Sequence, residues 1–253
     1  MWDRGILKAN AKIALGGRYW TAFGVSLLAA AISGGYSWIT NQFTDTYQGV
    51  PWVPEFFASP IETIGRLVTV ISLIGLIYSI FVGLPVAIGE ARYFIRNHFG
   101  ASDIGTLFSS FRYGYLNSTA AMLVTEIFIG LCYLLLIIPG IIKQLQYSMV
   151  KYLLADNPNL TGSRARELSR ILTNGEKGAI FVLGLSFIGW YLLGIICFVV
   201  GVLFVNPYYQ ATMAELYIFL RDRAIQTHQI DPAELGLVPP AGPYYNPENP
   251  PIL

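Results

Sequence analysis

Charged residues are scarce in this sequence. Asp, Glu, Lys and Arg make up 12% of the 253 residues, whereas hydrophobic residues make up 54%. Soluble domains carry about a quarter charged residues, so roughly half of the usual charge is missing. This deficit argues against a soluble globular domain and favours a protein that exposes apolar surface to lipid.

Residue types that carry catalytic chemistry are also sparse. The two cysteines, Cys132 and Cys197, both lie inside apolar runs, where a disulfide is not expected. His98 and His228 are the only histidines, and neither is spaced for a metal site with a cysteine or a carboxylate. No serine sits in a nucleophile elbow, and no glycine-rich phosphate loop follows a strand. We therefore expect a protein that is not an enzyme and that has no cofactor or metal.

Long apolar runs dominate what the sequence does contain. Because lipid cannot satisfy backbone polar groups, each run is expected to form a helix. The predicted fold is all-α: a polytopic membrane bundle of six transmembrane helices, arranged as three helical hairpins, each preceded by an amphipathic interfacial helix. The predicted spans are Thr21–Trp38, Ile61–Ala91, Leu116–Ile138, Gly140–Leu154, Gly178–Val205 and Tyr208–Leu220.

Prolines punctuate these runs. The second span is longer than a crossing needs, so it is expected to tilt, to kink at Pro85 or to protrude. Pro139-Gly140 predicts the turn of a tight helical hairpin or a sharp kink, and Asn206-Pro207 predicts a turn, because proline lacks an N–H and disfavours helix in the residue before it. A polar-aromatic loop is expected over residues 39–60.

Amphipathic helices are predicted over residues 2–15, 103–111 and 161–173. In the first, Ile6, Ala9 and Ile13 recur on the apolar side, and Ser102 is placed to cap the second. The arginines of residues 164–170 could bind anionic lipid headgroups, although a role in setting topology is favoured.

The distribution of Lys and Arg predicts the orientation. Most Lys and Arg residues fall in the N-terminal helix, in the connectors over residues 92–112 and 151–177, or after Leu220, and the connectors near residues 39–60, 139 and 206 carry almost none. By the positive-inside rule both termini face the cytoplasm. We expect a six-span transmembrane domain over residues 1–228 and a Pro-rich cytoplasmic tail over 229–253 that is disordered or peripheral.

Small residues recur every four positions in the first two spans, which favours close helix packing over a substrate groove. The packing candidates are Ala22, Ser26, Ala30, Gly75, Ser79, Gly83 and Ala87.

Glu126 is the sharpest polar signal, because a carboxylate near the middle of a span costs roughly 2.5–3.5 kcal/mol. It is expected to point into the bundle, either as part of an ion pathway or as a hydrogen-bonded structural residue. Gln146 and Tyr147 are the expected partners, since Lys143 lies at a depth that differs by roughly 14 Å. Lys143, Gln144 and Gln210 complete the candidate intramembrane polar site, and Glu90, Asn117 and Glu215 are weaker polar signals outside it.

Several motifs together carry a resemblance. They are Ile138-Pro139-Gly140-Ile141-Ile142-Lys143, Tyr147-Ser148-Met149, Tyr152 and Leu154-Ala155-Asp156-Asn157-Pro158. With these motifs the chain, up to about Arg223, resembles a bacterial integral-membrane family, domain-of-unknown-function family nine-seven-five. The resemblance implies a multi-pass protein of the bacterial plasma membrane. It brings no established activity and no catalytic residues.

These observations favour a non-enzymatic scaffold, accessory or membrane-organising subunit. The alternative is a small transporter or channel with a polar pathway near Glu126, which its proline-broken helices would suit. The expected partners are the lipid bilayer, anionic headgroups, and a membrane-protein partner or a second copy of the chain, but no nucleic acid.

Overall fold

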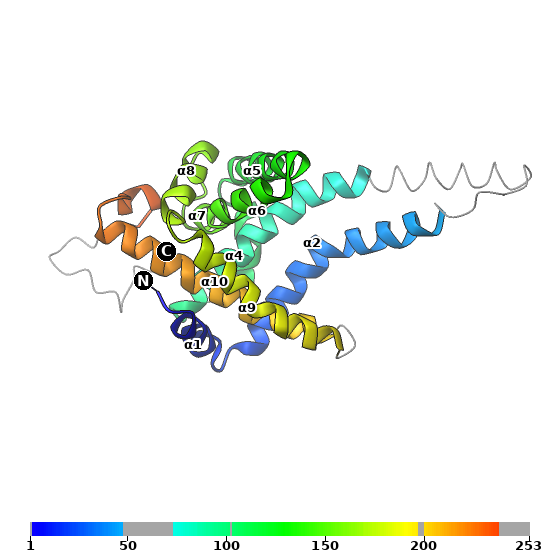
Figure 1. The fold of residues 1–253 in the computed structure, drawn as a ribbon, viewed down its shortest axis with the longest axis horizontal. Helices are drawn as coiled ribbons and strands as arrows, with labels where there is room; N and C mark the ends of the chain where they lie inside the picture. Colours follow the sequence, from blue (N-terminus) through cyan, green and yellow to red (C-terminus); the bar gives the residue numbers. More distant parts are fainter. Residues whose placement is uncertain (1, 48–72, 102, 197–199, 238–253) are drawn as a thin grey trace, which may run out of the picture.

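The computed structural model describes residues 2–47, 73–101, 103–196 and 200–237. In these residues every regular element is helical, in agreement with the predicted all-α class. Three helices are long and apolar enough to cross a membrane within the described part: Leu73–His98, Tyr115–Leu135 and Lys177–Gly194. The α2 helix (Tyr19–Tyr47) and the helix that ends at His98 run out together at one end of the molecule (Figure 1).

The α5 helix (Tyr115–Leu135) and α6 (Ile137–Gln146) form a hairpin whose turn is a single residue. Leu136 is extended, with φ −159° and ψ 142°, and α6 begins directly after it. The turn predicted at Pro139-Gly140 is therefore wrong. Pro139 lies in the first turn of α6, where its missing N–H costs no hydrogen bond. Gly140 lies against the ring of Tyr133, too close for any side chain.

A similar correction applies to the next pair of helices, α9 (Lys177–Ile196) and α10 (Val200–Gln226). The turn predicted at Asn206-Pro207 is wrong, because Pro207 lies inside α10. Proline is tolerated in membrane helices where neighbouring groups satisfy the freed backbone. The two helices approach closely near their ends, since a Cβ on Gly201 would lie 2.6 Å from the Gly194 Cα atom.

The helix that contains Pro85 is continuous from Leu73 to His98, but it is irregular where the kink was predicted. A π-helical turn, η1 (Ser79–Gly83), precedes α4 (Leu84–His98), and Pro85 occupies the first turn of α4. The predicted loop over 39–60 begins too early, because α2 remains helical to Tyr47. The rest of that loop and residues 61–72 lie outside the described part.

The amphipathic segments form α1 (Arg4–Leu15), the 3-10 helix η2 (Ile104–Phe111) and α8 (Gly162–Leu172). Asp103 caps η2, and Ser102 lies outside the described residues. In α1 the face packed on the protein consists of Leu7, Ala11 and Leu15. Ile6 and Ile13, on the apolar side named from the sequence, are 61% and 76% exposed.

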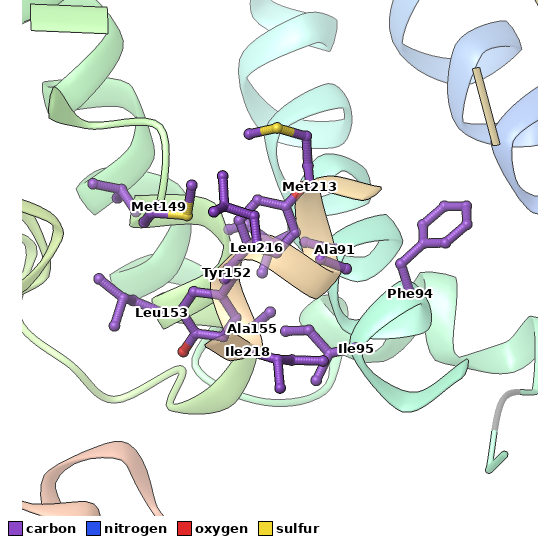
Figure 2. Packing of buried hydrophobic residues seen from close by; sticks show 14 of the residues in the cluster. Ala91, Phe94, Ile95, Met149, Tyr152, Leu153, Ala155, Met213, Leu216 and Ile218 are labelled. Carbon is purple, nitrogen blue, oxygen red and sulfur yellow. The ribbon is translucent and has the colours of Figure 1, made fainter. Parts of the chain in front are cut away.

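The core lies where α4, α7 (Val150–Asp156) and α10 meet. Figure 2 shows its side chains: Ala91, Phe94, Ile95, Met149, Tyr152, Leu153, Ala155, Met213, Leu216 and Ile218. The predicted fourth span is broken here, because α6 ends at Gln146 and α7 begins only at Val150. The hydroxyls of Ser169 and Thr173 donate to the Gln146 carbonyl at 2.8 and 3.2 Å, which satisfies the end of α6.

Part of the predicted tail is ordered. The 3-10 turn η3 (Pro232–Leu235) packs on the same end of the molecule as α8 (Figure 1). Ile230 and Leu235 are buried, and Arg164 Nε lies 2.5 Å from a carboxylate oxygen of Glu234. Residues 238–253 lie outside the described part.

Candidate polar site at the centre of the bundle

Glu90 is a buried carboxylate on α4 that receives hydrogen bonds from two other helices. The Ser26 hydroxyl of α2 donates to Glu90 Oε1 at 3.0 Å, and the Gln210 amide of α10 donates to Oε2 at 3.3 Å. Both carboxylate oxygens therefore have a donor, which offsets part of the cost of burying the group.

Lys151 extends this arrangement to a fourth element, α7. Its Nζ atom donates to Gln210 Oε1 at 3.1 Å and lies 4.9 Å from the ring centroid of Tyr152. Gln210 thus bridges a cation and an anion, accepting from one and donating to the other. We call Ser26, Glu90, Lys151 and Gln210 the Glu90 cluster. Its members come from four elements, so it ties them together through polar contacts.

Glu126 lies apart from the Glu90 cluster. It is exposed on α5 and has no hydrogen-bond partner among the described residues, so it does not point into the bundle as predicted. Lys151 is close enough to act electrostatically on both Glu126 and Glu90. The break between α6 and α7 turns Lys151 back toward the bundle, and sequence periodicity did not predict that break.

The remaining polar candidates make a separate set of contacts on α6. Lys143 Nζ donates to Gln146 Oε1 at 3.4 Å and lies 5.6 Å from the Tyr147 ring centroid. Gln144 accepts a hydrogen bond from the Tyr133 hydroxyl of α5. Of the polar candidates named from the sequence, only Gln210 and Glu90 belong to the Glu90 cluster.

The small-residue candidates are all buried or partly buried. Ala22 and Ser26 are buried on α2, and Gly75 and Gly83 are buried on the helix that leads into α4, while Ala30, Ser79 and Ala87 are partly buried. A Cβ on Gly83 would lie 3.8 Å from the Ser33 Cα atom of α2. Ser26 therefore both packs and donates a hydrogen bond.

A second buried polar group lies toward the end of the molecule that carries η3. Asp156 Oδ2 lies 3.0 Å from Arg221 Nη1 and accepts from the Tyr217 hydroxyl at 2.6 Å. We call these three residues the Asp156 cluster. Burial alone would lower the pKa of Arg221, but Asp156, Tyr217 and Asp222 together outweigh it, and the net result is a raised pKa.

The neighbouring residues of the same motif make further ties. Asn157 donates to the Glu234 carbonyl at 2.8 Å, and Asn117 of α5 donates to the Pro158 carbonyl at 2.8 Å. Hydrogen bonds from Arg164 to Glu234 and Glu167 raise the pKa of Arg164. The Leu154-Ala155-Asp156-Asn157-Pro158 motif thus joins α5, α10 and η3.

Sequence reasoning missed Lys151, Asp156 and Arg221 as site residues. The available signal was the polar run Tyr147-Ser148 ahead of Lys151 and the opposite charges of Asp156 and Arg221. Within the described residues, no three His, Cys, Asp or Glu side chains gather closely enough to hold a metal ion.

Comparison with models of known protein families gives a match. A family model described as protein of unknown function (DUF975) matches residues 6–224, a range that includes both clusters. Neither the curated proteins nor the solved structures give a match.

Proposed function

The chain belongs to a protein family of unknown function, DUF975, and we propose that this member is a non-enzymatic scaffold or accessory subunit in a membrane. The observation that carries the proposal is the Glu90 cluster. Its hydrogen-bonding groups are directed at one another, across four elements, rather than at an open site. Such a network stabilises one arrangement of helices.

The placement we propose is a bacterial plasma membrane, with six spans and both termini in the cytoplasm. Charged side chains that pair with one another lie toward one end of the helices, as in Asp156–Arg221 and Glu176–Arg223. The α5–α6 hairpin carries exposed apolar residues at its turn, including Leu134 at 84% and Ile138 at 72% exposure. Charged pairs at one end of the helices and exposed apolar residues at the hairpin turn support a hairpin that inserts into lipid, with the charged end at the cytoplasmic surface.

A transporter or channel is the second candidate, and one observation favours it. Lys151 lies within electrostatic range of Glu126, which is exposed on α5, and it contacts Gln210, which donates to buried Glu90. Intramembrane acids serve ion or proton pathways in transporters.

Ion flux separates the two candidates. The purified protein is reconstituted into vesicles that contain a pH-sensitive dye, and proton entry is followed after a pH step, with and without a potassium gradient. The scaffold proposal predicts the flux of protein-free vesicles for the wild type and for Glu126→Gln. A wild-type flux that is lost in Glu126→Gln, but kept in the exposed control variant Glu167→Gln of α8, would establish the transport candidate instead.

Scaffold function also requires contact with another membrane component. A photo-crosslinking residue at Leu134, on the exposed hairpin, should give a discrete protein adduct in membranes of the native host. The same residue at Met122, which is 6% exposed, should give none. Adducts with lipid alone at Leu134, and at Leu131 and Ile138 on the same hairpin, would contradict the scaffold proposal.

A further inference from the structure

We propose that the groove between α1, the start of α2 and the α9–α10 hairpin binds one anionic phospholipid, with an acyl chain in the groove and the phosphate at Lys8 and Lys12. This inference goes beyond the scaffold proposal and requires only that the protein resides in a membrane. It concerns a different surface from the arginines of α8.

The groove is an apolar hollow lined by side chains of α1, α2, α9 and α10. Its volume is about 560 Å³, and it is lined by Leu15, Tyr19, Trp190, Phe204, Val205 and Tyr208. This volume lies in the range of about 300–1,000 Å³ that is typical of small-molecule sites. The Tyr19 hydroxyl donates to the Phe204 carbonyl at 2.9 Å, and Phe23 stacks on Phe204 at 4.7 Å between ring centroids. These contacts hold α2 and α10 together along one side of the hollow.

The positive charge beside the groove lacks an anionic partner. Lys12 lines the hollow, with Nζ 5.7 Å from the Tyr208 ring centroid, and Lys8 Nζ lies 4.4 Å from that of Phe187. Neither ammonium group pairs with a carboxylate among the described residues. The acid of this segment, Asp3, accepts hydrogen bonds from Gly5 and Ile6 at the start of α1.

The electrostatic surroundings of Lys8 favour a bound anion. Burial, followed by the positive charges of Arg4 and Lys12, lowers the pKa of Lys8. An anion placed between Lys8 and Lys12 would relieve that repulsion. A free phosphate would satisfy the charges but leave the apolar hollow empty, whereas a phospholipid supplies both parts in one molecule.

The outer face of α1 places the groove at a lipid surface. Ile6 and Ile13 are 61% and 76% exposed on the side that does not pack on the protein. An amphipathic helix of this kind lies in the plane of the membrane interface, with its basic residues at headgroup level. Each Lys or Arg near such a surface favours anionic lipid by a factor of about five.

The test measures which lipids the purified protein retains. The full chain in neutral detergent is mixed with dioleoylphosphatidylglycerol or dioleoylphosphatidylcholine, and bound lipid is counted by native mass spectrometry. We expect the wild type to retain phosphatidylglycerol in preference to phosphatidylcholine. Lys8→Gln/Lys12→Gln should lower that preference on the order of 30-fold. Val205→Phe, which fills the hollow, should lower retention of the lipid while α1 keeps its charge.

Two further variants and a comparison with inorganic phosphate complete the test. Arg112→Gln removes an exposed cation that follows η2 and should keep the wild-type preference, because Arg112 lies outside the groove. Lys12→Gln alone changes an exposed side chain and should still lower the preference about fivefold if the double variant fails to fold. Equal retention of the two lipids by the wild type, an equal loss in Arg112→Gln, or thermal stabilisation by inorganic phosphate as strong as that by phosphatidylglycerol would each overturn the proposal.

Discussion

Arg221 lies almost entirely inside the protein, with 3% of its side chain exposed, and its partner Asp156 is 10% exposed. Arg221 also pairs with Asp222, which is 39% exposed, at the same distance of 3.0 Å. The two carboxylates therefore offer a comparison at the scale of single residues. One is part of the interior, and the other faces solvent, where an ion pair is screened.

Asp156→Ala should destabilise the protein by about 3–5 kcal/mol, because it leaves a buried guanidinium and the Tyr217 hydroxyl without their acceptor. Asp222→Ala should cost no more than about 1 kcal/mol. Unfolding of both variants in detergent, followed by circular dichroism, measures the difference. Equal costs for the two variants would show that burial does not govern this pair.

Single polar residues were the least predictable part of the site. Glu126 stood out because it interrupts an apolar run, yet it is exposed, and Lys151 was not singled out at all. Residue depth inferred from the sequence assumes unbroken helices, whereas the predicted fourth span is broken between α6 and α7. The helix break at Tyr147–Met149 changes both the direction and the depth of the residues that follow it, and hydrophobic periodicity does not predict such a break.

At the scale of elements, Gly89 and Gly83 differ in how closely a neighbouring segment approaches them. A Cβ on Gly89 of α4 would overlap the Leu107 carbonyl of η2, whereas a Cβ on Gly83 would make ordinary contact with Ser33 at 3.8 Å. Gly89 therefore has no room for a side chain, whereas Gly83 has room for a methyl group.

Gly89→Ala should cost about 1–3 kcal/mol, because η2 has to move away from α4. Gly83→Ala should be neutral or stabilising by up to about 1 kcal/mol, since alanine favours helix and has room there. Thermal unfolding in detergent compares the two. Loss of stability in Gly83→Ala, with none in Gly89→Ala, would contradict the packing described for α4.

The sequence predicted the existence of most elements and misplaced their ends. The amphipathic helices near 2–15 and 161–173 have clear periodicity, and their predicted ends lie within two residues of the observed ones. The hairpin turns were assigned to Pro139 and Pro207, but both prolines lie within the returning helices. The rule that proline disfavours helix placed both turns at the prolines. The first turn instead lies at Leu136, and packing keeps Pro207 inside α10. Neither effect can be predicted from a single sequence.

At the scale of the whole molecule, the proposed six spans depend on the broken segment. The α6 helix has 10 residues and so spans only about 15 Å, half of a hydrocarbon core of about 30 Å. A fourth crossing therefore needs α6 and α7 together, with the Tyr147–Met149 break inside the membrane. Polar backbone at such a depth is tolerated where protein covers it, as the Ser169 and Thr173 hydroxyls do for the Gln146 carbonyl.

Cysteine labelling tests the proposed topology. In a chain with Cys132 and Cys197 replaced by serine, a cysteine at Asp45 should react with an impermeant thiol reagent added to intact cells. A cysteine at Glu167 should react only after permeabilisation, because the basic segments face the cytoplasm. Reversed labelling would invert the orientation, and labelling of both sites from outside would contradict six spans.

The central claim is that the Glu90 cluster stabilises the helical arrangement as one unit. A double-mutant cycle of Glu90→Gln and Lys151→Gln tests it, with the free energy of unfolding measured by denaturant titration in mixed micelles. A parallel cycle of Lys151→Gln with Glu167→Gln on α8 serves as the control and should be additive within about 0.5 kcal/mol. We predict that Glu90 and Lys151 are coupled through Gln210 by about 0.5–3 kcal/mol, so that the double variant loses less stability than the two single variants combined. Additive losses in both cycles would contradict the account, because Glu90 and Lys151 would then be independent residues rather than parts of one stabilising network.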